Sequence, residues 1–329
     1  MKHASLSTDI GLFYGKTGVA MYAFHAAKAF SDHTLQTLAE KMIDEVVEHL
    51  EKKESNLISF DTGLAGIVFG FEYIARNGFI SPVGENAFAA LDDRIFHEII
   101  ISDKIPLGFS GIIGCLFYLY PKFLHGNPNS TSFRYFQRLA IELINRLSQE
   151  IGGSEKIFTE PPAFNIQWEL PLVLFILGKM HKLNFFERKI RRTAEQLSLH
   201  VLTVYPKLHY NRLYLLFGMK ALTHLSIDGW DDHVSLLEKN ISMDKILHKE
   251  LKCRSISIKN GIAGISLICD YLSATDPDNQ FTISYGELEK KISESDYWAP
   301  QVADNIGLLH GHAGMGFALL NKKFNTLKK

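Results

Sequence analysis

The chain has 329 residues, of which 46% are hydrophobic and 22% charged, with 35 Lys and Arg against 36 Asp and Glu. This composition excludes a disordered, collagen-like or low-complexity protein, and the balanced charge gives no net field to attract nucleic acid or an anionic membrane. Three cysteines are too few for the disulfide framework of a secreted domain, and the longest apolar stretch is too short to span a membrane. We therefore expect a globular cytoplasmic protein with no membrane span and no nucleic-acid partner.

A short phrase, Gly-x-x-Gly followed by an apolar run, recurs along the chain. Five copies begin at Gly15, Gly63, Gly108, Gly261 and Gly311. Two eroded copies fill the gap between the third and fourth of these, at residues 168–172 and 214–218. The last positions of the seven phrases are 18, 66, 111, 172, 218, 264 and 314, which are spaced by 48, 45, 61, 46, 46 and 50 residues. Such regular spacing indicates seven structural repeats.

Each phrase should open a buried helix, because the run after it is apolar nearly all round. The segments between the phrases carry a single apolar stripe, which is typical of an amphipathic helix on the outside of a fold. We predict these outer helices at 33–53, 82–101, 131–151, 185–205, 231–251 and 285–295. The last begins with a capping-box pattern at Ser284 and Glu287, and the second with Ser81 followed by a proline.

The alternation of buried and exposed helices predicts an all-α fold. An open row of helix pairs does not need one fully apolar helix in each pair, whereas a closed ring with the apolar helices inside does. We therefore predict an α/α toroid that forms one domain over residues 1–329. Glycines at the start of each inner helix fit this fold, since crowded helix ends need a close approach of the backbone.

With seven such phrases and the endings NGIAGISLICDYL and GLLHGHAGMGFALL, the sequence resembles the lanthionine synthetase C-like (LanC-like) family, the cyclase components of lanthipeptide biosynthesis. The resemblance covers nearly the whole chain. It implies the α/α toroid, and an enzyme that adds a peptide cysteine thiol to a dehydrated Ser or Thr. A zinc ion makes that thiol a thiolate. The partners that it implies are a precursor peptide and a lanthipeptide dehydratase.

The zinc ligands of that family lie in a Trp-Cys-Tyr-Gly phrase opening the fifth repeat and a Cys-His-Gly phrase opening the sixth. If the fifth repeat is aligned on Gly218, Leu213 replaces the cysteine and Tyr214 keeps the tyrosine. In the sixth repeat, Lys259 and Asn260 replace the cysteine and the histidine. Leucine cannot bind zinc, a protonated lysine repels it, and asparagine is a poor ligand. We expect a divergent member of the family that lacks this cofactor.

His310 and His312 flank Gly311 at the last opening and are the alternative metal ligands, with Cys253 as a third candidate. Hydrogen bonding within the loop is the competing interpretation of the two histidines. Lys259 could bind a carboxylate or form an imine, or it could simply take part in a charge pair near the helix N-terminus.

Two further residues are catalytic candidates. Glu169, with Trp168, stands where the family has a His-Gly phrase; it could carry a proton, or it could favour the helix N-terminus through the helix dipole. Tyr214 could act at the site or belong to the core with its hydroxyl satisfied. A basic cluster on a predicted outer helix could bind an acidic leader peptide or RNA, although a solvated face is the favoured interpretation: Arg188, Lys189, Arg191 and Arg192.

Three functions compete. The first is a degenerate, zinc-free cyclase homologue, a pseudoenzyme that binds a precursor peptide or a dehydratase as a scaffold. The second is an active cyclase that works without metal or uses a site built from His310, His312 and Cys253. The third is a glycan-acting enzyme with paired carboxylates, for which only Glu169 is clearly placed at an opening. We favour the first, because the glycine framework is retained while the ligand positions are not.

Overall fold

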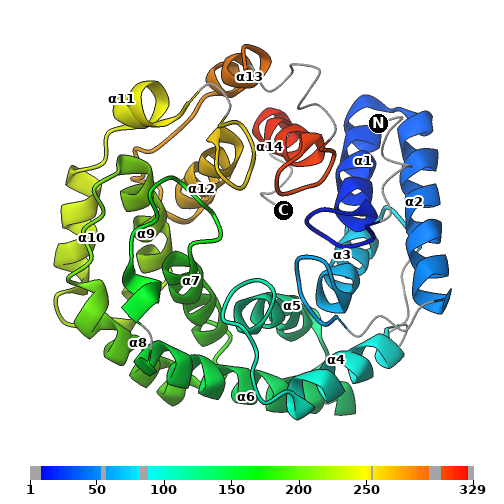
Figure 1. The fold of residues 1–329 in the computed structure, drawn as a ribbon, viewed down its shortest axis with the longest axis horizontal. Helices are drawn as coiled ribbons and strands as arrows, with labels where there is room; N and C mark the ends of the chain where they lie inside the picture. The colour runs from blue at the N-terminus through cyan, green and yellow to red at the C-terminus, as the bar shows by residue number, and fades with distance from the viewer. Residues whose placement is uncertain are drawn as a thin grey trace. The chain divides into compact units, whose positions relative to one another are not determined.

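The computed structural model describes residues 9–52, 57–81, 88–153, 155–252, 255–295 and 305–324, and within these ranges the chain forms helices and turns but no strand. The predicted all-α class is confirmed. The chain divides into two compact units, residues 1–102 with 251–329 (unit 1) and residues 103–250 (unit 2). The helices of each unit are labelled in Figure 1.

Seven buried helices correspond to the seven predicted inner helices, although the fifth begins before the phrase that was predicted to open it. Those of unit 1 are α1 (Lys16–Phe30), α3 (Leu64–Arg76), α12 (Ile262–Thr275) and α14 (His312–Phe324). Those of unit 2 are α5 (Ile112–His125), α7 (Glu169–His181) and α9 (His209–Lys220). In α1 the buried residues run almost without a break from Thr17 to Ala27, as expected for a helix that is covered on every side.

The outer helices carry one buried stripe each. They are α2 (His33–Lys52), α4 (Ala89–Ile101) and α13 (Tyr285–Ser293) in unit 1, and α6 (Thr131–Gly153), α8 (Glu187–Val201) and α10 (Trp230–Lys239) in unit 2. In α2 only Ala39, Met42 and Val46 are buried, at helical spacing. The capping box of Ser284 and Glu287 is present as predicted. The predicted end of α2 at 53 and the predicted start of α4 at 82 lie outside the described residues.

Two predicted outer helices are corrected by the structure. The helix predicted at 185–205 is shorter, because Phe186 has a φ of 55° and cannot be part of a right-handed helix. The helix predicted at 231–251 is broken after Lys239 into α10, α11 (Met243–Lys245) and a π-helical turn, η4 (Ile246–Glu250). The break occurs because Asn240 ends α10 and the Ser242 side chain caps the next segment by accepting from the Lys245 N–H.

Inner and outer helices pair within each unit. In unit 1 the inner helices form a row in which α12 packs on α14, α14 on α1 and α1 on α3, so the first and last helices of the chain are neighbours. Outer helices α2 and α4 pack on α1 and α3 respectively, and α13 packs on both α14 and α12. In unit 2, α7 packs between α5 and α9, and α6, α8 and α10 pack on α5, α7 and α9. This arrangement is consistent with the predicted α/α toroid.

The second glycine of the phrase makes room for the loop that precedes the helix. A Cβ on Gly66 would overlap the carbonyl oxygen of Phe60, and the same conflict arises between Gly18 and Leu12. Only glycine allows the preceding loop to return this closely over the first turn of the helix. The repeated glycines are therefore a packing requirement of the helix openings.

The third phrase begins three residues later than the sequence suggested. Gly111 is the residue before α5, so the phrase is Gly111-Ile-Ile-Gly114 and not the one that starts at Gly108. Three glycines spaced three residues apart make two overlapping copies of the pattern, between which the sequence does not discriminate. The structure selects the second copy, because the Ile112 N–H donates to the Pro106 carbonyl (2.8 Å) and closes the loop there. The first three phrases then end at 18, 66 and 114, at equal intervals of 48 residues.

Candidate functional site

A ladder of backbone hydrogen bonds joins the four helix openings of unit 1. Each bond runs from the residue two positions before the opening glycine to the residue at the same position in the neighbouring repeat. The N–H of Lys259 donates to Leu309 (2.9 Å), that of Leu309 to Phe13 (3.0 Å) and that of Phe13 to Asp61 (2.9 Å). Because every repeat uses the same position, the ladder fixes the register of the sixth, seventh, first and second openings.

Three side chains gather at this end of unit 1. The His310 ring stacks on the Tyr14 ring, with 5.7 Å between their centroids and 24° between their planes. Burial lowers the pKa of the His310 imidazole, and the positive charge of Lys259 lowers it further. At neutral pH the imidazole is therefore unprotonated and can accept a proton. The sequence prediction included Lys259 and His310 but missed Tyr14, which precedes Gly15 as His310 precedes Gly311.

The other candidate residues close to these openings in the sequence are Asn260, His312 and Cys253. The Asn260 side chain is part of a turn, because its Oδ1 accepts from the Ser257 hydroxyl (2.8 Å). His312 is the first residue of α14, where burial lowers the pKa of its imidazole. Cys253 lies outside the described residues. Over the part of the chain that the structure describes, no three His, Cys, Asp or Glu side chains gather as metal ligands would.

The residues at the positions matched to the family's zinc ligands do not fit a zinc ion. At the sixth opening, whose register the ladder fixes, these are the half-buried Lys259 and the amide of Asn260. An ammonium group has no lone pair to donate, and the amide oxygen of Asn260 is already bonded to Ser257. The third matched residue, Leu213, belongs to unit 2 and is fully buried.

The alignment of the fifth repeat on Gly218 is wrong as a helix opening. Gly218 lies in the last turn of α9, which begins at His209 after Leu208. A Cβ on Gly218 would meet the backbone of Pro171 at 2.6 Å, so this glycine allows α9 to approach α7. The pattern was misleading because a glycine that serves helix–helix packing resembles one that opens a helix.

Tyr214 is a buried residue in the middle of α9. Its hydroxyl donates to the Ile166 carbonyl (2.5 Å), and burial raises its pKa well above the ordinary value. The phenol is therefore neutral and hydrogen-bonded in the folded protein. Phe164 and Trp168 pack edge-on against its ring.

The α9 opening is capped by two carboxylates from distant segments. Glu160 accepts from the backbone N–H groups of Lys207 (2.7 Å) and Leu208 (3.0 Å) and from Nδ2 of Asn211 (2.9 Å). Glu250 accepts from the N–H groups of His209 (2.8 Å) and Tyr210 (3.0 Å). These bonds satisfy the donors that a helix N-terminus leaves open. Sequence reasoning missed both carboxylates, because each lies about 40 residues or more from the donors that it caps, beyond the reach of local capping patterns.

Glu169 lies at the start of α7, after Trp168, as the sequence predicted. Its carboxyl group is half-buried beside Gly108, and burial raises its pKa while Lys156 opposes the shift.

The two free cysteines among the described residues, Cys115 and Cys269, are fully buried, and burial raises the pKa of each thiol to about 12. Neither thiol is a nucleophile at neutral pH.

The basic cluster on α8 is partly used within the fold. Arg191 donates to the Leu225 carbonyl (2.9 Å) and lies 3.9 Å from the Glu195 carboxylate. The candidate residues therefore fall in two groups: Glu169, Leu213, Tyr214 and the α8 cluster in unit 2, and Lys259, Asn260, His310 and His312 in unit 1.

The fold and the openings define an all-α repeat protein in which five of the seven inner helices begin directly after a glycine. The sequence model for "Lanthionine synthetase C-like protein" matches residues 7–165, and no curated protein matches the chain significantly. Over these residues, just under half of its length, the chain is similar to the lanthionine synthetase C-like family. The match ends before α7, and the backbone ladder shows that the sixth and seventh openings repeat the geometry of the first and second. No helix of the described residues is long and apolar enough to cross a membrane.

Proposed function

We propose that this protein binds a precursor peptide, or the dehydratase that modifies it, without zinc chemistry of its own. The observation that carries the proposal is the presence of Lys259 and Asn260 at the sixth opening, in a register fixed by the hydrogen bond from Lys259 to Leu309. A cation and a turn-bonded amide replace two metal ligands, while the glycine-opened helices are retained. Retention of packing without the ligands supports a binding role.

The opening of unit 1 offers suitable groups for a peptide. The Lys259 ammonium can pair with a carboxylate or donate a hydrogen bond to a backbone carbonyl. The stacked rings of Tyr14 and His310 provide a half-buried apolar surface beside it. A cytoplasmic location is part of the proposal, and the free thiols of Cys115 and Cys269 are compatible with a reducing compartment.

Calorimetry with a synthetic peptide that carries one dehydroalanine and one cysteine tests this function, with elemental analysis of the protein purified without a histidine tag. We expect binding without stoichiometric zinc, and weaker binding after Lys259→Glu. The control is Lys252→Glu, which makes the same charge change at an exposed residue of the same segment. The proposal fails if neither this peptide nor a dehydratase binds, or if stoichiometric zinc is present and is lost with His310→Ala.

A second candidate is a metal-independent cyclase, which the neutral imidazole of His310 favours. In this reaction His310 takes the proton of the peptide thiol, and the thiolate forms a C–S bond at the β-carbon of the dehydro residue. The α-carbon then takes the proton back from the imidazolium, so the mass is unchanged. Thiol alkylation followed by mass spectrometry should show that the peptide thiol becomes protected from alkylation, and that His310→Gln abolishes this protection. If the thiol is protected no faster than in the absence of the protein, only the binding role remains.

The two units are proposed to form one domain over residues 1–329. Unfolding should then be a single transition when followed by helical circular dichroism and by tryptophan fluorescence. In a Trp298→Phe variant the two remaining tryptophans, Trp168 and Trp230, both lie in unit 2. Fluorescence that changes at a different denaturant concentration from the helical signal would indicate two domains.

A further inference from the structure

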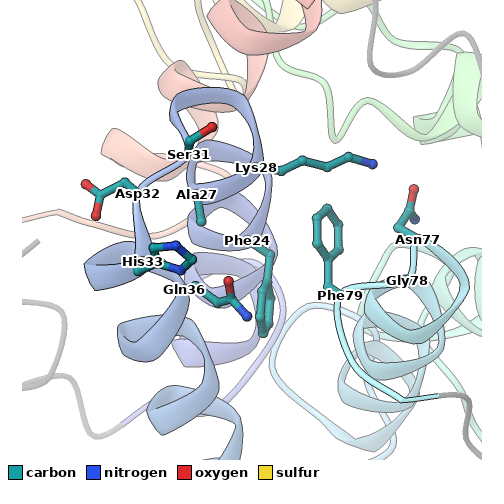
Figure 2. Close-up of a pocket in the computed structure, with 10 residues that line it drawn as sticks. All are labelled: Phe24, Ala27, Lys28, Ser31, Asp32, His33, Gln36, Asn77, Gly78 and Phe79. Carbon is teal, nitrogen blue, oxygen red and sulfur yellow. The ribbon is translucent and has the colours of Figure 1, made fainter.

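A pocket of about 410 Å³ lies in unit 1, at the ends of α1 and α3 opposite to the glycine openings (Figure 2). Its volume falls within the range of small-molecule sites. Because α1 has 15 residues, the pocket is roughly 20 Å from the opening at Gly15, at 1.5 Å per residue. A ligand bound in this pocket would therefore not touch Lys259 or His310.

One wall of the pocket is aromatic. Phe24 of α1, which is 1% exposed, stacks on Phe79 from the segment after α3, with 5.4 Å between ring centroids and 19° between planes. Gly78, beside Phe79, has a φ of 71° and no atom within 4 Å of the place where a Cβ would stand. The turn that carries Phe79 is therefore open at Gly78.

The other side of the pocket presents a cation. Lys28 extends from α1 above the Phe79 ring, with its Nζ 5.8 Å from the ring centroid, and reaches toward the turn that carries Asn77 (Figure 2). Among the described residues, no carboxylate lies within ion-pair distance of Lys28. Asp32, one helical turn further on, is directed to the start of α2, where its Oδ1 accepts from the N–H groups of Thr34 (2.8 Å) and Leu35 (3.2 Å).

The field of Lys28 also reaches the residues behind the aromatic wall. His25 contacts Phe79 edge-on, and the charge of Lys28 adds to the effect of burial in lowering the pKa of this histidine. The pocket therefore combines an apolar wall with the cation of Lys28, and it is also lined by the Asp32 carboxylate, which is bonded to the start of α2.

We propose that this pocket binds a carboxylate with an aromatic body, through an ion pair with Lys28 and packing against Phe79. The Asn77 amide, which uses one N–H to bond the Tyr73 carbonyl (2.8 Å), keeps a second N–H for the ligand. The same chemistry is found in a free aromatic acid and in the C-terminal carboxylate of a peptide that ends in an aromatic residue. The inference does not depend on the proposed function of the opening at Lys259.

Calorimetry with the full-length protein tests the proposal with three probes: N-acetyl-phenylalanine, its amide, and an acetylated tripeptide that ends in phenylalanine. We expect the acid to bind and the amide, which lacks the charge, to bind at least about tenfold more weakly. Lys28→Met should weaken binding of the acid by a similar factor. The matched control is Lys41→Met, which removes the charge of an exposed lysine of α2 away from the pocket.

The results distinguish a peptide C-terminus from a free aromatic acid as the ligand, and they also show whether the proposal is wrong. Binding of the tripeptide at least as tight as that of the short acid supports a peptide C-terminus, and binding of the short acid alone supports a free metabolite. Equal binding of acid and amide, equal binding by the Lys28→Met variant, or no binding of either acid at millimolar concentration overturns the proposal. Since Lys28 is exposed, its replacement should leave the fold intact, as circular dichroism will show.

Discussion

The positive charge of Lys259 lowers the pKa of His310, and the backbone bond from Lys259 to the Leu309 carbonyl keeps the two residues at the same helix opening. Replacement of the lysine should therefore raise the pKa of His310. We expect Lys259→Met to shift the NMR titration of the His310 ring to higher pH, while Lys252→Met leaves it unchanged. An unchanged titration in the first variant would show that the two side chains do not interact.

The close approach at Gly66 predicts a large effect of a single methyl group. Gly66→Ala would place a Cβ against the Phe60 carbonyl, and such overpacking costs about 1–3 kcal/mol. Gly286→Ala is the control, because this helical glycine of α13 has open space at the Cβ position and should become about 0.5–1 kcal/mol more stable. Urea unfolding measures both, and equal effects would contradict the packing argument.

The capping of α9 by Glu160 predicts that stability depends on this carboxylate. Glu160→Ala removes the acceptor for three N–H donors and should lower the free energy of unfolding by about 2 kcal/mol. Glu160→Gln keeps one acceptor oxygen and should cost less. Glu155→Ala, at an exposed residue of the nearby helical turn η2 (Glu155–Phe158), should change stability by less than about 0.5 kcal/mol. The loss of unfolding free energy should be largest in Glu160→Ala, smaller in Glu160→Gln and smallest in Glu155→Ala, and a different order would contradict the capping role.

The buried His25 predicts acid sensitivity. Burial, with a smaller effect of Lys28, lowers its pKa from 6.5 to about 4, so the folded protein favours the neutral ring. This contribution to stability is fully present above the unfolded pKa of 6.5 and is lost as the pH falls toward 4, up to about 3 kcal/mol in total. In His25→Leu the free energy of unfolding should fall less steeply over this range, whereas the exposed control His97→Gln should behave as the parent protein.

Much of the fold could be predicted from the sequence, because the repeated phrase and the helical stripes are local signals. The openings at Gly15, Gly63, Gly261 and Gly311 and the capping box at Ser284 all follow from such patterns. The third opening needed the structure, since two copies of the pattern overlap there. The α9 opening was also missed, because Glu160 and Glu250 reach it from distant parts of the chain.

The candidate site could be predicted only in part. Lys259 and His310 were expected at two separate openings, but their proximity depends on the packing of α12 against α14. Tyr14 was missed because tyrosine has no ligand or nucleophile signature of its own, although it occupies the repeat position of His310. Tyr214 keeps a residue type of the family, and only the structure reveals its bond to the Ile166 carbonyl.

The packing of α14 against α1 has a consequence for biosynthesis. A ribosome releases the segments of unit 2 while the partners of α1 at the far end of the chain are still untranslated. The nascent chain must therefore carry the α14-facing surface of α1 uncovered until translation ends, which is when unit 1 can close. Chaperone protection of this surface should matter most in the final stage of synthesis.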